Sequence, residues 1–114
     1  MRAYELMVIF DGDLDEAAVA QAQTVATDAL TGLGASIKKI DPWGKRKFAY
    51  EIDHKQDGTY LVLEFLTEGE DLAGFERSLR LADEVVRHKL IRLPDGEATR
   101  RGLLGGDVTP ASAG

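Results

Sequence analysis

The sequence of 114 residues contains no cysteine, no asparagine and only two histidines. Without cysteine the chain can form no disulfide, thiolate metal site or redox pair, and it has no thiol nucleophile. We expect His54 to be an exposed loop residue and His88 to be a partly buried strand residue. The acidic residues lack the spacing of a calcium loop, and the glycines of the last segment follow no strand that could open a phosphate-binding loop. We therefore expect no enzyme, no cofactor and no small-molecule substrate.

Long hydrophobic runs are also absent. The apolar run that precedes Asp11 has about five residues, whereas a helix that spans a membrane needs about 20. No cleavage region of a signal peptide follows this run. The length fits one domain. The expectation is a soluble cytoplasmic protein that does not contact membranes.

An excess of basic residues is missing as well. The chain has 14 basic and 20 acidic side chains, and its net charge of -6 argues against bulk attraction to nucleic acid. The basic residues nevertheless gather in two segments. Residues 36–55 hold six basic and three acidic residues, and residues 77–101 hold seven and four. A solvated surface of mixed charge explains such segments unless the fold brings them together.

Hydrophobic periodicity predicts four strands and two helices. Alternating apolar residues favour strands over 4–10, 36–52, 59–66 and 85–93. The second of these is broken at 41–44, where Pro42 places the strand at a sheet edge or makes 42–44 a bulge or loop. Apolar spacings of three and four favour one helix from a capping box of Asp13 and Glu16 to Gly34, and another over 72–82. The Asp-Gly pair in residues 55–58 favours a hairpin turn.

This order of elements is that of an α+β, ferredoxin-like βαββαβ sandwich. Right-handed crossovers place both helices on one face of a four-stranded antiparallel sheet of strand order 4-1-3-2. The residues expected to face the helices are Tyr4, Leu6, Val8, Phe10, Phe48, Tyr50, Leu61, Leu63 and Phe65. The residues expected on the open face, which commonly serves a partner, are Glu5, Met7, Ile9, Lys47, Tyr60, Val62, Glu64, Arg87, Lys89 and Ile91.

The composition changes at Pro94. Residues 94–114 include five glycines and two prolines, so this segment buries too little apolar surface to offset its ordering entropy. We expect a domain over residues 1–93 and a flexible C-terminal tail over 94–114. The short basic and apolar segment formed by Arg100, Arg101, Leu103 and Leu104 is suited to ordering on a protein partner.

Three separated motifs resemble one family. They are the start Met1–Glu5 before an apolar strand, the stretch 44–52 (GKRKFAYEI) followed by Gly58-Thr59-Tyr60, and the stretch 79–88 (LRLADEVVRH). Over residues 1–93 the chain is similar to bacterial small-subunit ribosomal protein S-six. The resemblance implies a structural constituent of the small ribosomal subunit that binds the central domain of 16S rRNA as a heterodimer with small-subunit ribosomal protein S-eighteen. The rRNA-binding positions that it implies are Arg2, Lys45, Arg46, Lys47, Tyr60, Arg80 and Arg87.

The chemistry of these basic and aromatic residues supports RNA binding independently of the resemblance, and it leaves other functions open. Exposed lysine and arginine contact phosphates, and Tyr60 is suited to stacking on an unpaired base. The two basic segments belong to opposite sheet edges, which favours several weak phosphate contacts, or one edge for RNA and the other for protein. Trp43 is expected to pack at the break in its strand or in the core.

Three alternatives share the fold. A small-molecule-sensing regulatory domain needs a ligand cleft, usually with glycines after the first strand, where only Gly12 is found. A cofactor-free oxygenase needs a histidine or asparagine that faces a closed apolar pocket. A free-standing RNA-binding domain needs paired exposed aromatic residues on its central strands, where only Tyr60 is available.

Overall fold

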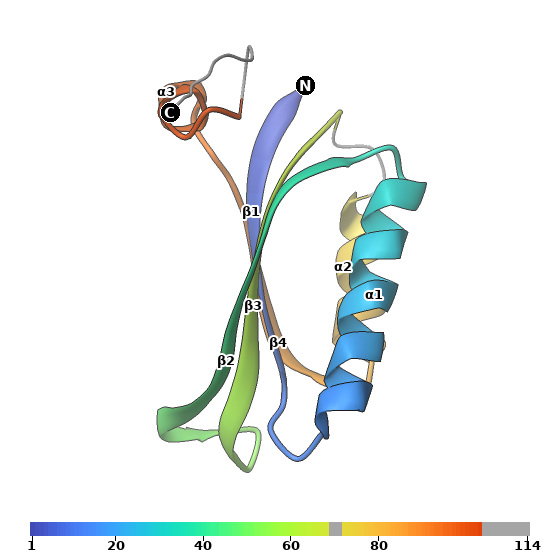
Figure 1. Ribbon diagram of the computed structural model, residues 1–114, viewed down its shortest axis with the longest axis vertical. Coiled ribbons are helices and arrows are strands. Elements are labelled where there is room, and N and C mark those ends of the chain that lie inside the picture. The colour runs from blue at the N-terminus through green and yellow to red at the C-terminus, as the bar shows by residue number, and fades with distance from the viewer. Residues whose placement is uncertain (69–71, 104–114) are drawn as a thin grey trace.

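The computed structural model describes residues 1–68 and 72–103, which form a sheet with two long helices packed on one face (Figure 1). The strands are β1 (Arg2–Asp11), β2 (Ser36–Ile52), β3 (Lys55–Thr67) and β4 (Val85–Arg92), and the helices are α1 (Glu16–Gly32), α2 (Leu72–Leu81) and α3 (Asp95–Arg100). All paired strands are antiparallel, in the order β2-β3-β1-β4. The predicted ferredoxin-like fold and strand order are confirmed.

The main core lies between the sheet and the helices α1 and α2. Alternate residues of β1 and β3 point toward the helices, as their period of two predicts. Leu6, Val8, Leu61 and Leu63 are fully buried there. They pack with the apolar side of both helices in one cluster, whose helical members are Leu30, Leu72, Phe75 and Leu79. This packing fixes which face of the sheet is left for a partner.

The first helix begins two residues later than the sequence predicted. Asp15, and not Asp13, is the N-cap, because its Oδ1 accepts a hydrogen bond of 2.8 Å from the backbone N–H of Ala18. The backbone N–H of Asp13 instead donates to Oδ1 of Asp11, so Asp13 belongs to the preceding turn. The end of α1 is as predicted, since Gly34 takes a φ of 89° directly after the C-cap.

The hairpin between β2 and β3 turns at Asp53 and His54, so the prediction of a turn over 55–58 was wrong. These two residues have φ values of 50° and 65°, and β3 already begins at Lys55. Gly58 lies inside β3 for a different reason. A Cβ atom there would lie 2.5 Å from Cγ2 of Ile9 and 2.9 Å from the carbonyl oxygen of Phe10. Glycine therefore serves a close approach between neighbouring strands.

The second half of β2 presents the faces opposite to those predicted. Its register with β3 shifts between Ile37 and Lys39 and again between Pro42 and Gly44, where Trp43 is the extra residue. After the second shift Arg46 pairs with Gly58, so the even-numbered residues that follow Trp43 share the open face with Tyr60. The predicted burial of Phe48 and Tyr50 against the helices was therefore wrong. The Phe48 ring contacts Tyr60 on the open face, and Tyr50 is 76% exposed. The same shift turns Lys47 away from the open face, where it was predicted, and brings Arg46 onto it.

The segment that follows β4 does not continue directly as a tail. Residues 95–100 form α3, which lies beside the start of β1 on the side of the sheet opposite α1 and α2 (Figure 1). Ala98 and Leu103 are buried with Ala3 and Leu93 in a second small cluster. The prediction that the flexible tail starts at Pro94 was therefore wrong for residues 94–103, because the open face offers an apolar surface on which this short helix packs.

Candidate nucleic-acid interface

Strand register orders the side chains on the open face of the sheet. Ile9 of β1 pairs with Tyr60 of β3 and Arg87 of β4, and Tyr60 pairs in turn with Gly44 of β2. Adjacent strands lie about 4.8 Å apart, so the β2 and β4 edges are about 14 Å from each other. The basic segments of the two edges are therefore separated by the two central strands, as the predicted strand order implied.

An aromatic cluster lies on this face at the β2 edge. The rings of Trp43 and Tyr60 are nearly parallel, with an interplanar angle of 10° and centroids 6.1 Å apart. The Phe48 ring meets Tyr60 edge-on at 6.3 Å. The indole Nε1–H of Trp43 donates a hydrogen bond of 3.0 Å to Oδ2 of Asp41. Trp43 thus packs at the bulge, one of the two placements expected, while 41% of its surface stays exposed.

Three basic residues follow Trp43 on the same edge strand, and one of them contacts the aromatic cluster. The guanidinium carbon of Arg46 lies 5.2 Å from the centroid of the Trp43 ring, a cation–π distance. Lys45 and Lys47 point to the other side of the same edge strand, where Lys45 lies 3.9 Å from Asp57. Within residues 1–68 and 72–103, no carboxylate lies within 4.0 Å of the cationic groups of Arg46 and Lys47. These two cations are free to meet a phosphate.

The other predicted RNA contacts do not join this group. Arg2 pairs with Thr67 and Lys45 pairs with Thr59, which places Arg2 about 26 Å along β3 from the basic group. Arg80 is exposed in the last turn of α2, in the helical layer. Arg87 is exposed on the open face at the β4 edge. The structure therefore brings together only Lys45, Arg46, Lys47 and Tyr60 of the predicted set.

Arg101 fastens the C-terminal helix to the open face. Its guanidinium group donates to Oε1 of Glu5 at 2.8 Å, to Oε2 of Glu64 at 3.0 Å and to Oε2 of Glu97 at 2.6 Å. The hydrogen bond to Glu5 is the main cause that raises the pKa of Arg101 above its ordinary value. Glu64 is a buried carboxylate in the middle of the sheet, and Arg101 supplies its counter-charge. Sequence reasoning gave no signal for this contact.

The residues predicted to bind a protein partner are therefore used in different ways. Leu103 is buried, and Arg101 is held by three carboxylates. Arg100 is exposed apart from an ion pair with Glu97, and Leu104 lies outside the described residues. Their binding to a partner stays a prediction.

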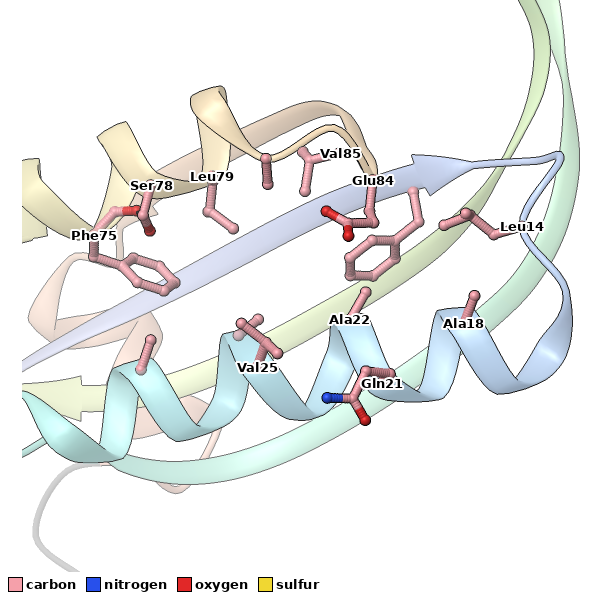
Figure 2. A pocket seen from close by; sticks show the side chains of 14 residues that line it. Leu14, Ala18, Gln21, Ala22, Val25, Phe75, Ser78, Leu79, Glu84 and Val85 are labelled. Atoms are coloured by element: carbon pink, nitrogen blue, oxygen red, sulfur yellow. The ribbon is translucent and has the colours of Figure 1, made fainter.

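A groove runs between α1 and α2 on the covered side of the sheet (Figure 2), with a volume of about 290 Å³. Small residues of α1, such as Ala18 and Ala22, face Phe75 and Leu79 of α2 across it. The hydroxyl of Ser78, one of its few polar groups, already donates to the carbonyl oxygen of Phe75 at 2.6 Å. Such a groove lacks the convergent polar groups that orient a small molecule.

Comparison with known proteins shows the family of the chain. A family model described as ribosomal protein S6 matches residues 3–92. The chain belongs to the ribosomal protein S6 family. It is 42% identical over 92 residues to small ribosomal subunit protein bS6 of Salinispora arenicola, and the aligned region covers 81% of this chain and 96% of that protein. It is 37% identical over 99 residues to the protein of the same description from Micrococcus luteus, which covers 87% and 98%.

A solved structure extends the comparison to the fold. The 30S ribosomal protein S6 of Thermotoga maritima superposes with a TM-score of 0.81 at 30% identity, and covers 88% of this chain and 94% of that one. The family is one of structural proteins of the small ribosomal subunit and not of enzymes, which confirms the prediction that the chain is not an enzyme. No helix among the described residues is long and apolar enough to cross a membrane.

Proposed function

We propose that the chain binds the central domain of 16S rRNA together with small-subunit ribosomal protein S-eighteen, as a heterodimer. The observation that carries the proposal is the β2 edge, where Arg46 and Lys47 have no carboxylate partner among the described residues. Arg46 lies over the exposed ring of Trp43 on the open face, and Lys47 projects from the other side of the strand. Lysine and arginine at an exposed strand edge neutralise phosphates, and aromatic rings stack on unpaired bases.

The charge of the chain supports a need for the partner. A net charge of -6 makes the general attraction to RNA weak, so a few local phosphate contacts give little affinity by themselves. A second protein that binds the same RNA adds its own contacts without a change in this chain. We place the contact with this partner at the C-terminal segment, where Arg100 is exposed at the end of α3.

Filter retention of a central-domain rRNA fragment tests the proposal. The chain alone should bind weakly, and addition of the partner protein should increase the affinity at every salt concentration of a series. Equally tight binding with and without the partner would contradict the heterodimer and favour a free-standing RNA-binding domain. Absence of binding under both conditions would reject the RNA function itself.

Neutralisation of the basic group locates the contact. Substitution of Lys45, Arg46 and Lys47 by glutamine should lower the slope of log affinity against log salt by roughly 0.7–0.9 for each phosphate that the variant no longer neutralises. Lys38→Gln is the matched control, because Lys38 is an exposed lysine of the same strand outside the group. An unchanged slope in the folded triple variant would make this edge an ordinary solvated surface.

A further inference from the structure

Trp43 occupies an unusual place for the largest side chain of the sequence. It is the extra residue of a bulge on an edge strand, and 41% of its surface is exposed. It is also the sole tryptophan of the chain. The main core does not include it, and the second cluster under α3 does not either. Its packing on Tyr60 therefore leaves apolar ring surface in contact with solvent.

The geometry of the stack shows what surface is available. Near-parallel rings with centroids 6.1 Å apart are offset, so they overlap over part of their area only. The polar end of the indole is already satisfied, because Nε1–H donates to Asp41. The remaining surface of the indole is a flat π surface that needs no hydrogen bond from a ligand. A planar ring makes the largest contact with such a surface.

The charges around the ring select the kind of planar ligand. Arg46 lies over the indole, and Lys47 is an exposed cation of the same strand with no carboxylate partner in the described part of the chain. The nearby acidic residues already have partners. Asp41 accepts from the indole and Asp57 pairs with Lys45. Glu5 and Glu64, which line the same hollow of the open face as Trp43, pair with Arg101. An apolar protein segment laid on Trp43 would have to desolvate Arg46 without offering it a counter-charge. A nucleotide offers both a ring and a phosphate.

We propose that Trp43 is the stacking platform for an unpaired nucleobase, with Arg46 moving from the indole to the phosphate of the same strand. The inference rests on the proposed RNA function and adds to it the residue that receives a base. It also changes the part expected of Tyr60, one side of whose ring is partly covered by Trp43. Tyr60 acts as the support beneath the platform.

One fluorine signal can report on this site. Incorporation of 5-fluorotryptophan into the full chain gives a single ¹⁹F resonance, because the sequence has one tryptophan. The labelled chain is measured alone, with the unlabelled partner protein, and with the partner and the central-domain rRNA fragment. Stacking of a base on the indole should shift the resonance upfield, by ring current, on addition of the RNA.

The titration distinguishes the stacking site from a protein interface and from a failure of the proposed function. A shift that appears with the partner alone places Trp43 in a protein interface and overturns the inference. If filter retention confirms that the complex forms but the resonance does not move, the stacking inference is overturned. The proposed RNA function then stands. Failure of any complex to form rejects the proposed function, and the stacking site with it.

Substitutions give a second, independent test. Trp43→Ala should weaken RNA binding about 5- to 140-fold, the range that corresponds to the removal of one stacked base. Trp43→Phe keeps a smaller ring and should lose less, and it is the test variant if Trp43→Ala unfolds. Tyr50→Ala is the matched control, because Tyr50 is an exposed aromatic residue of the same strand. Equal effects of Trp43→Phe and Tyr50→Ala in folded proteins would overturn the inference.

The salt dependence separates stacking from an indirect effect. Removal of a stacked base leaves every phosphate neutralised as before, so the slope of log affinity against log salt should stay the same in Trp43→Ala. Arg46→Gln should lower this slope by roughly 0.7–0.9. A slope that falls equally in both variants would show that Trp43 acts only by positioning Arg46, which also overturns the inference.

Discussion

Substitution of Leu103 distinguishes a docked C-terminal helix from a flexible tail. Leu103 is 6% exposed and packs with Ala3, Leu93 and Ala98. Leu103→Ala removes three buried carbon atoms, each worth about 0.8 kcal/mol, so the docked state should lose about 2.4 kcal/mol. In a domain of about 100 residues each kcal/mol lowers Tm by about 4 °C. The expected fall in Tm is therefore about 10 °C if α3 unfolds together with the sheet.

Local undocking of α3 sets an upper limit on this effect. The second cluster is small and lies at one end of the sheet, so α3 can detach while the rest of the domain stays folded. No substitution in α3 can then cost more than the free energy with which α3 docks. A chain that ends at Leu93 lacks the helix and measures that limit. Leu103→Ala should lie between the unchanged chain and this truncated one.

Thermal unfolding followed by circular dichroism measures these differences. Thr99→Ala is the control, because Thr99 is an exposed residue of α3 and should leave Tm within about 1 °C. If Leu103→Ala behaves like Thr99→Ala, and the chain ending at Leu93 melts at the same temperature as the full chain, α3 does not dock in solution. That result would restore the interpretation of residues 94–103 as tail.

Three further experiments test other contacts of the fold. Gly58→Ala should destabilise the domain by about 1–3 kcal/mol in urea unfolding, since its Cβ would lie 2.5 Å from Ile9; a neutral result would contradict the close strand approach. The pKa of Asp11 lies below its ordinary value of 3.8, because its carboxylate accepts a hydrogen bond from the Asp13 N–H and, as a smaller cause, contacts Lys55. The ionised carboxylate therefore adds stability above pH 3.8, and this stability is lost as the pH falls through the lowered pKa. The stability difference between the unchanged chain and Asp11→Asn should therefore shrink in urea titrations at acid pH. Arg101→Ala should destabilise less when Glu64→Gln is also present, and additive effects in this double-mutant cycle would contradict their pairing.

The sequence was sufficient to predict the fold because its central elements are internally consistent. Tyr4, Leu6, Val8 and Phe10 alternate along β1, and Leu61, Leu63 and Phe65 alternate along β3, so each strand has one apolar face. The connection rules for parallel and hairpin strands then leave one common arrangement. Both central strands lie between neighbours on either side, where pairing keeps the period of two regular.

The edge strand β2 could not be predicted in the same way. A period of two shows which residues share a face only as long as no residue is added. Pro42 indicates a bulge or loop over 42–44, but only the pairing of β2 with β3 shows that Trp43 is the added residue and that the register also shifts between Ile37 and Lys39. Gly58 misled for a related reason: an Asp-Gly pair is typical of a turn, and the close approach of Ile9 that requires glycine there is a tertiary fact.

The C-terminal helix was missed because its stability is not local. A helix of six residues that includes Gly96 has little intrinsic stability, and its composition is that of a tail. Leu103, Ala98 and Arg101 gain most of their partners from β1 and β3, which are far away in the sequence. Local composition therefore assigns such a segment to the tail, because it contains no information about the surface on which the helix packs.

The bulge at Trp43 is also what creates the candidate interface. Without the extra residue, Lys45 and Lys47 would share the face of Tyr60, and Arg46 would point to the opposite side. With it, Arg46 lies over Trp43 on the open face, while Lys45 and Lys47 project from the other side of the same edge. The basic segment therefore presents cations on both sides of one strand, beside a single stacked ring pair. A nucleic-acid strand that follows this edge can place a base on the open face and phosphates along both sides, which neither a flat basic patch nor an exposed aromatic residue alone would allow.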